Sequence, residues 1–554
     1  MKKLAIIVSA AAALITAVFY AAPFQASPQP LARIFPAGAM LYLEAKDFQA
    51  ELRAWNASDE QKRWLASVNY ESFQRSNLYL KLNAAWTEFS AAAGFVPDSA
   101  LVASLAGGQS ALAIYDIGNL EFLYVTRIPT ARVTATALWQ SRTKYETRHA
   151  GNSDFFVHVD SGRTVAFASA GDYLVLGTRE ELVAGALRLL AGETLTPVTQ
   201  EAWFADTTSA AATPGDLRLV LNLEALIKSP QYRSYWIQRN ASEVRNYRAG
   251  IADLVRTNGE LREDRIFVRK NAAQAAAAPA DNLLRLAPDS AAFCRSWAHP
   301  ASSEIAALVE QKLLAPKVAG PISEDYAPAV DFGTGETGAE SDLETRIDEP
   351  PLDAHSAIAL DDLRRVLESA HLDAALEVQS GESLADGVFI TTPTVLAVKS
   401  GANWDSTAIR NALSAAAASL WTASGSGTGW VAHQRGARTW YALDGLAPLE
   451  IAVDGDLLLL GDSQQAIGAV MDRLDIRPTP SNATSTALFR HAAGRDDFRR
   501  IVTLLDHTQP AGRPAFFSAE VWGLSEIFSR VREVEVQSRD MGGVVRETVT
   551  YHTR

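Results

Sequence analysis

Gly171-Asp172-Tyr173-Leu174-Val175-Leu176-Gly177-Thr178 has a second version in Gly455-Asp456-Leu457-Leu458-Leu459-Leu460-Gly461-Asp462. Each stretch begins with a Gly-Asp pair typical of a turn, continues with apolar residues that predict a β-strand, and reaches a glycine. Arg179 to Leu190 and Ser463 to Leu474 follow directly, with apolar residues at i, i+1, i+4, i+5 and i+8. This spacing predicts one apolar face of an α-helix, so the chain contains the same turn–strand–helix pattern twice.

The residues before each stretch extend this match. Short apolar runs separated by Gly-containing and Asp-containing turns predict an antiparallel meander that ends in the repeated strand. The predicted strands are Phe155 to Val159, Thr164 to Ala168 and Tyr173 to Leu176 in the first copy, and Thr439 to Leu443, Leu449 to Val453 and Leu457 to Leu460 in the second. Consecutive apolar residues in these strands, above all Leu457 to Leu460, predict burial on both faces of the sheet.

Further predicted elements also occur in both copies. Ala111 to Tyr115 and Leu120 to Ile128 flank a turn and predict a β-hairpin, whose counterpart in the second copy is Val395 to Val398. Helices are expected around Val133 to Tyr145 and from about Ser406 to Trp421. The two copies therefore share the order of their elements as well as one motif.

The ends of the copies match too. Gly250 to Arg256 and Leu524 to Val531 are predicted to be amphipathic helices, and each leads into a strand with an Arg-Glu pair, Arg262-Glu263 or Arg546-Glu547. We expect these pairs to form cross-strand charge contacts on a solvent-exposed face. A duplication explains all of these matches in one step.

The predicted fold is α+β, with two homologous halves. Each half is an antiparallel sheet of meander and hairpins with helices packed mainly on one face, after an N-terminal transmembrane or signal helix. The predicted segments are 1–26 as membrane anchor or signal, 27–35 as a proline-containing stalk, 36–270 as the first half, 271–285 as a linker, and 286–554 as the second half with an acidic insertion at 321–351.

The N-terminus predicts export. Lys2 and Lys3 precede Leu4 to Ala22, an uncharged stretch long enough to cross a hydrocarbon core of roughly 30 Å as a helix. Small residues are poorly placed for signal cleavage, since Tyr20 or Phe24 would lie at the −3 position. We therefore expect a single-pass inner-membrane anchor with the bulk of the chain in the periplasm or outside, and a secreted protein with a cleaved signal as the alternative.

Composition excludes some functions. The chain of 554 residues carries a formal net charge of −13, and no cluster of basic residues offers a surface for nucleic acid, which needs Lys and Arg to displace counterions. A single cysteine, Cys294, permits neither an intrachain disulfide nor a zinc site built from several cysteines. Its apolar neighbours predict a buried, unreactive thiol.

The acidic insertion is the first candidate site, because oxygen-rich loops bind Ca²⁺. The calcium candidates are Asp331, Glu336, Glu340 and Asp342. The insertion lacks the ligand spacing and the terminal glutamate of an EF-hand, so a solvated loop is the favoured interpretation.

Signatures of catalysis are missing from the sequence. It contains no His-Glu-x-x-His and no Gly-x-Ser-x-Gly. The glycine-rich run from Gly425 to Gly429 follows a predicted helix and precedes a predicted strand, the reverse of a phosphate-binding loop. His158 lies in a predicted strand, where a lone histidine is more often structural than a ligand. We therefore predict no catalytic residue and no cofactor.

Several of these motifs resemble those of exported bacterial proteins that carry a domain of unknown function. The motifs are the opening Pro36 to Glu44, the strand Gly171 to Thr178 and the closing Gly259 to Glu263. The resemblance covers most of both halves and implies a bacterial envelope setting. It implies no activity and no site.

Three functions remain open. A non-catalytic, membrane-anchored envelope protein that binds a protein partner or acts as a scaffold is favoured by the missing catalytic motifs. A carrier of a lipid or other apolar ligand would need a continuous apolar cavity between sheet and helices. The third is a hydrolase whose residues sequence order does not reveal.

Overall fold

The computed structural model describes most of the chain after residue 29. It describes residues 30–75, 77–96, 99–160, 162–229, 244–257, 259–273, 275, 282–314, 360–381, 384–386, 389–418, 429–443, 448–478, 481–496, 499, 523 and 529–553. The chain forms two compact units. Unit 1 comprises Met1–Ala275 with Met541–Arg554, and unit 2 comprises Ala276–Asp540. Both units combine helices with antiparallel strands, which confirms the α+β class.

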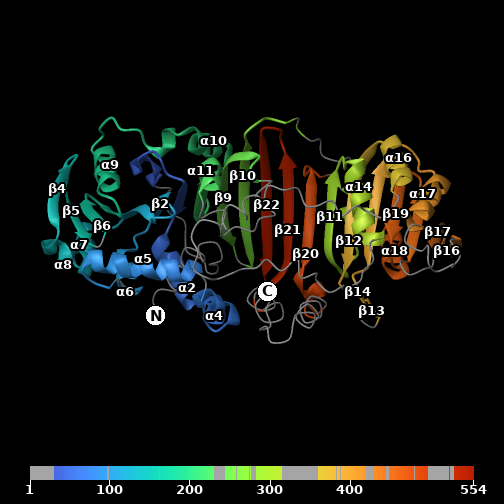
Figure 1. The fold of residues 1–554 in the computed structure, drawn as a ribbon, viewed down its shortest axis with the longest axis horizontal. Helices are drawn as coiled ribbons and strands as arrows, with labels where there is room; N and C mark the ends of the chain where they lie inside the picture. Colours follow the sequence, from blue (N-terminus) through green and yellow to red (C-terminus); the bar gives the residue numbers. More distant parts are fainter. Residues whose placement is uncertain are drawn as a thin grey trace, which may run out of the picture. The chain divides into compact units, whose positions relative to one another are not determined.

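The sheet of unit 1 is antiparallel throughout, and it places the meander at one edge (Figure 1). Its strands lie in the order β4 (Glu146–Ala150), β5 (Ser153–Asp160), β6 (Arg163–Ala170), β7 (Tyr173–Gly177), β3 (Glu121–Arg127), β2 (Ser110–Asp116), β1 (Leu41–Ala45), β8 (Leu217–Asn222), β9 (Tyr247–Thr257), β10 (Glu260–Arg269) and β22 (Val544–Thr553). The predicted meander and hairpin of the first copy are therefore confirmed.

Helices cover both faces of the unit 1 sheet, so the prediction of helices mainly on one face is wrong. One face carries η1 (Leu31–Ile34), α9 (Glu180–Leu190), η3 (Val198–Gln200) and α10 (Ala202–Ala210). The other carries α5 (Asn77–Ala93), α6 (Ser99–Leu105), α7 (Thr130–Thr134) and α8 (Ala137–Ser141), which Figure 1 shows apart from α9 and α10. The reason is the alternation of side chains along the strands. In β6, Ala166 and Ala168 pack with α9 and α10, whereas Val165 and Phe167 pack with α5 to α8.

Four more helices and a 3₁₀ turn belong to unit 1. They are α2 (Phe48–Ala57), α3 (Asp59–Leu65) and α4 (Val68–Arg75), which lead from β1 to α5, with η2 (Arg142–Lys144) before β4, and α11 (Leu223–Lys228) directly after β8. Side chains cap several of these helices. Asp47 accepts a hydrogen bond from Ala50 N, and Asn222 accepts one from Ala225 N.

The sheet of unit 2 is also antiparallel. Its strands lie in the order β16 (Val431–Arg435), β17 (Arg438–Leu443), β18 (Leu449–Asp454), β19 (Leu457–Gly461), β15 (Thr394–Ser400), β12 (Leu372–Ser380), β11 (Ala291–Ala298), β20 (Ser485–Arg490) and β21 (Val531–Asp540). A separate hairpin pairs β13 (Leu384–Asp386) with β14 (Phe389–Thr391). The second meander is confirmed.

Helices cover both faces of this sheet too. One face carries α14 (Ser302–Leu308), the π-helix η6 (Val309–Leu314), α16 (Asp361–Ser369) and α17 (Ser406–Ala418), and the other carries η5 (Leu283–Leu286) and α18 (Gln464–Met471). The leucines of β19 alternate between them: Leu458 and Leu460 belong to the first core, and Leu457 and Leu459 to the second. The predicted burial on both faces is confirmed.

The strand order of unit 2 from β16 to β21 matches that of unit 1 from β4 to β9, which a duplication requires. Equivalent contacts support the same alignment. The Thr178 hydroxyl after β7 accepts a hydrogen bond from Phe122 N at 2.8 Å, and the Asp462 carboxylate after β19 accepts one from Thr394 N at 2.7 Å. Because β22 pairs with β10, the compact units end at residues other than the predicted halves 36–270 and 286–554.

Two helix predictions are wrong. Gly250 to Arg256 lies in β9, where hydrogen bonds to β8 and β10 on either side outweigh its helix-like spacing. The equivalent Leu524 to Val531 lies outside the described residues except at its end, where Val531 begins β21. Val133 to Tyr145 forms α7, α8 and η2 rather than one helix, because Thr136 leaves the helical path and caps α8 through Trp139 N.

Two predicted connections are partly packed into cores. In the predicted stalk 27–35, Leu31 and Phe35 are fully buried, and in the predicted linker 271–285, Leu283 is fully buried. Short 3₁₀ turns place these apolar side chains against the sheets. The predicted anchor, 1–26, lies outside the described residues, and within the described part no helix has the length and apolarity to cross a membrane.

The buried thiol of Cys294 offers a test of unit 2. Its side chain is fully buried in β11, and burial raises its pKa to about 11. At pH 8 only about 0.1% would be the reactive thiolate. We expect a thiol reagent to label the folded chain no faster than β11 opens, and labelling to accelerate across the urea unfolding transition. Rapid labelling of the folded chain at pH 8 would contradict this structure around Cys294.

Candidate functional site

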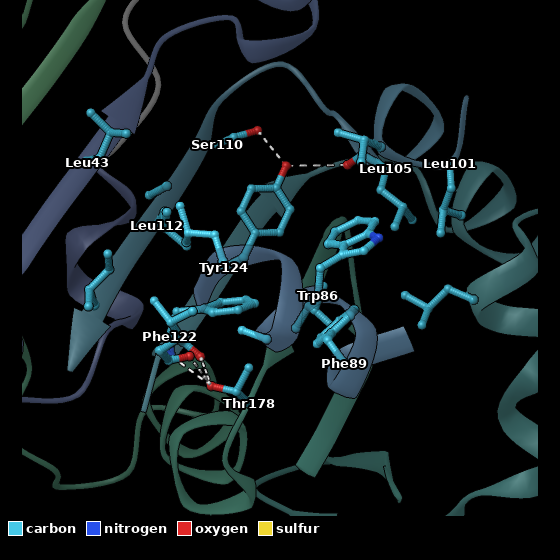
Figure 2. Close-up of a pocket in the computed structure, with 18 of the residues that line it drawn as sticks. Leu43, Trp86, Phe89, Leu101, Leu105, Ser110, Leu112, Phe122, Tyr124 and Thr178 are labelled. Carbon is cyan, nitrogen blue, oxygen red and sulfur yellow. Dashed lines mark hydrogen bonds between the residues drawn. The ribbon is translucent and has the colours of Figure 1, made fainter. Parts of the chain in front are cut away.

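Unit 1 contains an apolar cavity of about 370 Å³ between the sheet and helices α5 and α6 (Figure 2). Its floor is formed by side chains from β1, β2, β3 and β7, and its roof by α5 and α6. The main lining residues are Leu43, Leu112, Ile114, Phe122, Tyr124 and Leu176 from the sheet, and Leu82, Trp86, Phe89, Leu101 and Leu105 from the helices. Figure 2 shows Phe122 and Tyr124 on one side of the space, and Trp86 and Phe89 on the other.

The exposure of the strand residues shows that the sheet face under α5 and α6 is incompletely covered. Tyr42 in β1, and Leu123 and Val125 in β3, point to the opposite face and are fully buried. Leu43 and Tyr124 alternate with them and are only half-buried. Because neighbouring residues on one strand face opposite sides of the sheet, the difference lies in the two helix layers. The α5–α6 layer leaves space that the α9–α10 layer does not.

The size of the cavity suits a small organic molecule. Natural ligand pockets measure roughly 300–1,000 Å³, and an engineered apolar cavity of about 150 Å³ stays dry and binds benzene. The cavity in unit 1 is more than twice as large as the latter. Aromatic rings stiffen its wall: Phe89 lies 6.3 Å from both Trp86 and Phe122, measured between ring centroids.

Hydroxyl groups at one end of the cavity bond to one another. Tyr124 Oη donates to Ser110 Oγ at 3.3 Å, and Ser110 Oγ lies 2.6 Å from Thr126 Oγ1. Thr126 Oγ1 also accepts a hydrogen bond from Gly107 N at 3.1 Å, where the chain passes from α6 to β2. Burial raises the pKa of Tyr124, although its hydrogen bonds to Ser110 and Thr126 lower it. The tyrosine is therefore a neutral wall of the site across the physiological pH range.

Gly107 is required at that junction. A Cβ atom there would lie 2.1 Å from the carbonyl oxygen of Arg127 and 2.4 Å from Thr126 Oγ1. This close approach brings the end of α6 against β3, and thus holds the helix over the cavity.

The equivalent face of unit 2 is covered by buried side chains. The pairing registers align Leu43, which faces Leu112, with Arg295, which faces Glu377. They likewise align Ala45 with Trp297. Leucines and isoleucines of α14, η6, α16 and α17 pack against this face, and among them Ile305, Leu313, Leu363 and Ile409 are fully buried. Arg295 lies 3.8 Å from Glu377 and stacks 4.1 Å over the Trp297 ring.

None of the sequence-predicted candidates is among the described residues that line the cavity. The calcium candidates Asp331, Glu336, Glu340 and Asp342, with the insertion 321–351, lie outside the described residues, as does most of the Gly425 to Gly429 run. The described residues contain no group of three or more His, Cys, Asp or Glu side chains suited to a metal ion. His158 bonds through Nδ1 to the carbonyl oxygen of Ala92 at 2.7 Å, a structural contact.

The glutamates of the two predicted Arg-Glu pairs take part in contacts that support the sheet. Arg265 donates to both Glu263 and Glu547 at 2.7 Å, and so links β10 to β22. Only the contact with Glu547 crosses between strands, because Glu263 and Arg265 both belong to β10. The arginine in that contact is Arg265 and neither of the two arginines in the predicted pairs. Arg262 contacts Asp264, and Arg546 donates to the carbonyl oxygen of Ala210.

The sequence analysis named a cavity between sheet and helices as the requirement of a carrier, but it did not locate one. The aromatic residues of α5 and β3 could serve either purpose, and no periodicity distinguishes a wall from a core. Ala45 and Ala85 both line the cavity, and their small side chains are the feature of the sequence that points to it. This feature can be interpreted only once the strand register is known.

Comparisons with known proteins add no function. No protein-family model matches the chain, and no curated protein matches it. Among solved structures, crystal form I of TP0453 is 11% identical and covers 44% of this chain and 80% of that chain with a TM-score of 0.24. Crystal form III is 12% identical and covers 45% and 82% with a TM-score of 0.23. A likeness this low carries no argument about fold or function.

Replacing Thr126 with valine tests the hydrogen bonds that hold the cavity end. The Thr126→Val variant keeps the side-chain shape but removes the hydrogen-bond acceptor of Gly107 N and one of the two hydroxyl partners of Ser110 Oγ. We expect the free energy of unfolding to fall by about 1–3 kcal/mol in urea titrations. The control Thr147→Val, on the exposed edge strand β4, should change it by less than about 0.5 kcal/mol. Equal effects of the two substitutions would contradict the assigned network.

Proposed function

We propose that this protein is a non-catalytic binding protein that carries an apolar ligand in the cavity of unit 1. The observation that carries the proposal is the cavity itself, about 370 Å³ with a lining that is almost entirely aliphatic and aromatic. Water is a poor occupant of such a space, because a buried water molecule needs two to four polar partners. An apolar ligand would instead gain about 0.8 kcal/mol for each methylene group it buries.

The contrast with unit 2 supports the proposal. The same strand order and register there carry a closed face, with Trp297 in place of Ala45 and a layer of leucines above it. The fold can therefore fill this position, and the cavity of unit 1 is not an unavoidable gap between a twisted sheet and its helices. An unfilled cavity lowers stability, which favours a function for it.

The setting of the carrier remains a prediction from the first 26 residues. If they anchor the chain or direct its export, the ligand would be bound in the cell envelope. Binding of a protein partner, the other non-catalytic function expected from sequence, stays a prediction. We therefore place apolar-ligand binding first.

Native mass spectrometry tests whether the protein carries a ligand from its own cell. We expect the purified full chain to show an added mass below about 1 kDa that mild organic extraction removes, since pockets of this size class hold small organic molecules. A chain whose mass is unchanged by extraction, and which also fails to bind the alcohols described next, would refute the proposal.

A series of 1-alkanols from hexanol to hexadecanol tests the cavity in vitro. We expect affinity to rise about fourfold for each added methylene until the chain outgrows the cavity, and then to level off. The Ala45→Trp variant, which places an indole where unit 2 has Trp297, should weaken binding at least tenfold. Val68→Trp adds the same ring on the exposed surface of α4 and should leave binding unchanged. Equal loss in both variants would contradict the assigned site.

A further inference from the structure

Few polar groups line the cavity. Among the described residues, Arg163 in β6 is the one charged residue in the lining. The hydroxyl groups of Ser110, Tyr124 and Thr178 already bond within the protein, the last to Phe122 N and to the carbonyl oxygen of Leu120. Thr164 and the Trp86 indole add one neutral polar group each. An anionic group would find its charged partner at Arg163.

Arg163 is held at the boundary between cavity and solvent. Its Nε donates to Glu88 Oε2 of α5 at 2.6 Å, and its Nη1 donates to the carbonyl oxygen of Asn119 in the β2–β3 turn. The Arg163 side chain is 28% exposed and that of Glu88 43% exposed. Among the described contacts Nη2 takes no partner, so part of the guanidinium fork is available beside the apolar space.

The turn that Arg163 contacts is also unusual. Leu120 has a φ of 52°, a left-handed conformation that a branched side chain rarely adopts, and its side chain lines the cavity. Glycine or asparagine would fit this backbone with less strain. The leucine provides an apolar wall immediately beside the charged end.

From this arrangement we propose that the ligand is a single-chain amphiphile with an anionic head group, whose chain fills the cavity and whose carboxylate or phosphate bonds to Arg163. This inference rests on the proposed function and specifies its ligand. A guanidinium is suited to both anions, because its N–H groups match two oxygens at once. Glu88 is exposed enough to turn into solvent when a ligand anion takes its place, since an exposed ion pair of this kind contributes little stability.

Three probes with the same chain length separate the contributions. Palmitate and hexadecyl phosphate carry the two candidate anions, and methyl palmitate carries none. With the full chain, we expect at least one anion to bind about tenfold to a hundredfold more tightly than methyl palmitate, the range given by one charge-assisted hydrogen bond. The tighter of the two anions identifies the head group.

Variants of the charged pair test the assignment. Arg163→Gln should abolish the preference for the anion and leave methyl palmitate binding unchanged, whereas Arg163→Lys should keep part of the preference. Glu88→Gln should strengthen anion binding, because it removes the competing carboxylate. Trp86→Phe, which replaces the indole with a smaller aromatic ring and removes its N–H group, should keep the preference. Thermal unfolding checks that each variant is folded.

Two failures are distinguishable. If the wild-type chain binds methyl palmitate as tightly as both anions, and Arg163→Gln changes nothing, the anionic head group is refuted while apolar-ligand binding stands. If none of the three probes binds and Ala45→Trp has no effect on the alcohol series, the proposed function itself fails.

Discussion

The alternation of side chains along each β-strand is the constraint on which both units depend. Every second residue must find a partner on the opposite side of the sheet, so strands with consecutive apolar residues need a helix layer on each face. In β7, Leu174 packs under α5–α8 and Val175 under α9–α10. The registers of β5–β6 and β6–β7 determine which residues of these strands share a face of the sheet, and so which helix layer each residue contacts.

Coverage of those faces is unequal, and the inequality creates the site. The α9–α10 layer buries most of the strand residues beneath it, whereas the α5–α6 layer leaves a hollow of about 370 Å³. The side chains that line an empty apolar hollow lack packing partners on one side, which lowers stability. Occupation by an apolar ligand would recover it, which makes stability and binding two aspects of one structural feature.

The sequence predicted what is set by short-range pattern. Turn glycines and apolar runs located the strands β5 to β7 and β17 to β19, and the spacing of Leu182, Val183, Ala186 and Leu187 located α9. It failed where neighbours decide. Gly250 to Arg256 has helical spacing, but Asp253 in this segment is buried and bonds to Arg218 of the adjacent strand at 2.6 to 2.7 Å, an interaction available only to a strand in that register. The second helix layer was missed for a similar reason, because α5 is apolar around most of its circumference and shows little preference for one face.

The cavity could not have been predicted, since a hollow is a property of several elements together. Its position became interpretable only from the pairing registers, which align Leu43 and Leu112 with Arg295 and Glu377 of unit 2. In unit 2 that pair is accompanied by Lys312, 4.0 Å from Glu377, and the Glu377 side chain is only 5% exposed. A buried charge must keep its partners close, because an unpaired one is expensive to desolvate. The charged pair therefore ties η6 down onto β11 and β12, whereas the leucines of unit 1 make no such demand on α5 and α6. The exchange at this pair of facing positions, together with Trp297 in place of Ala45, distinguishes the covered face of unit 2 from the face of unit 1 that holds the cavity.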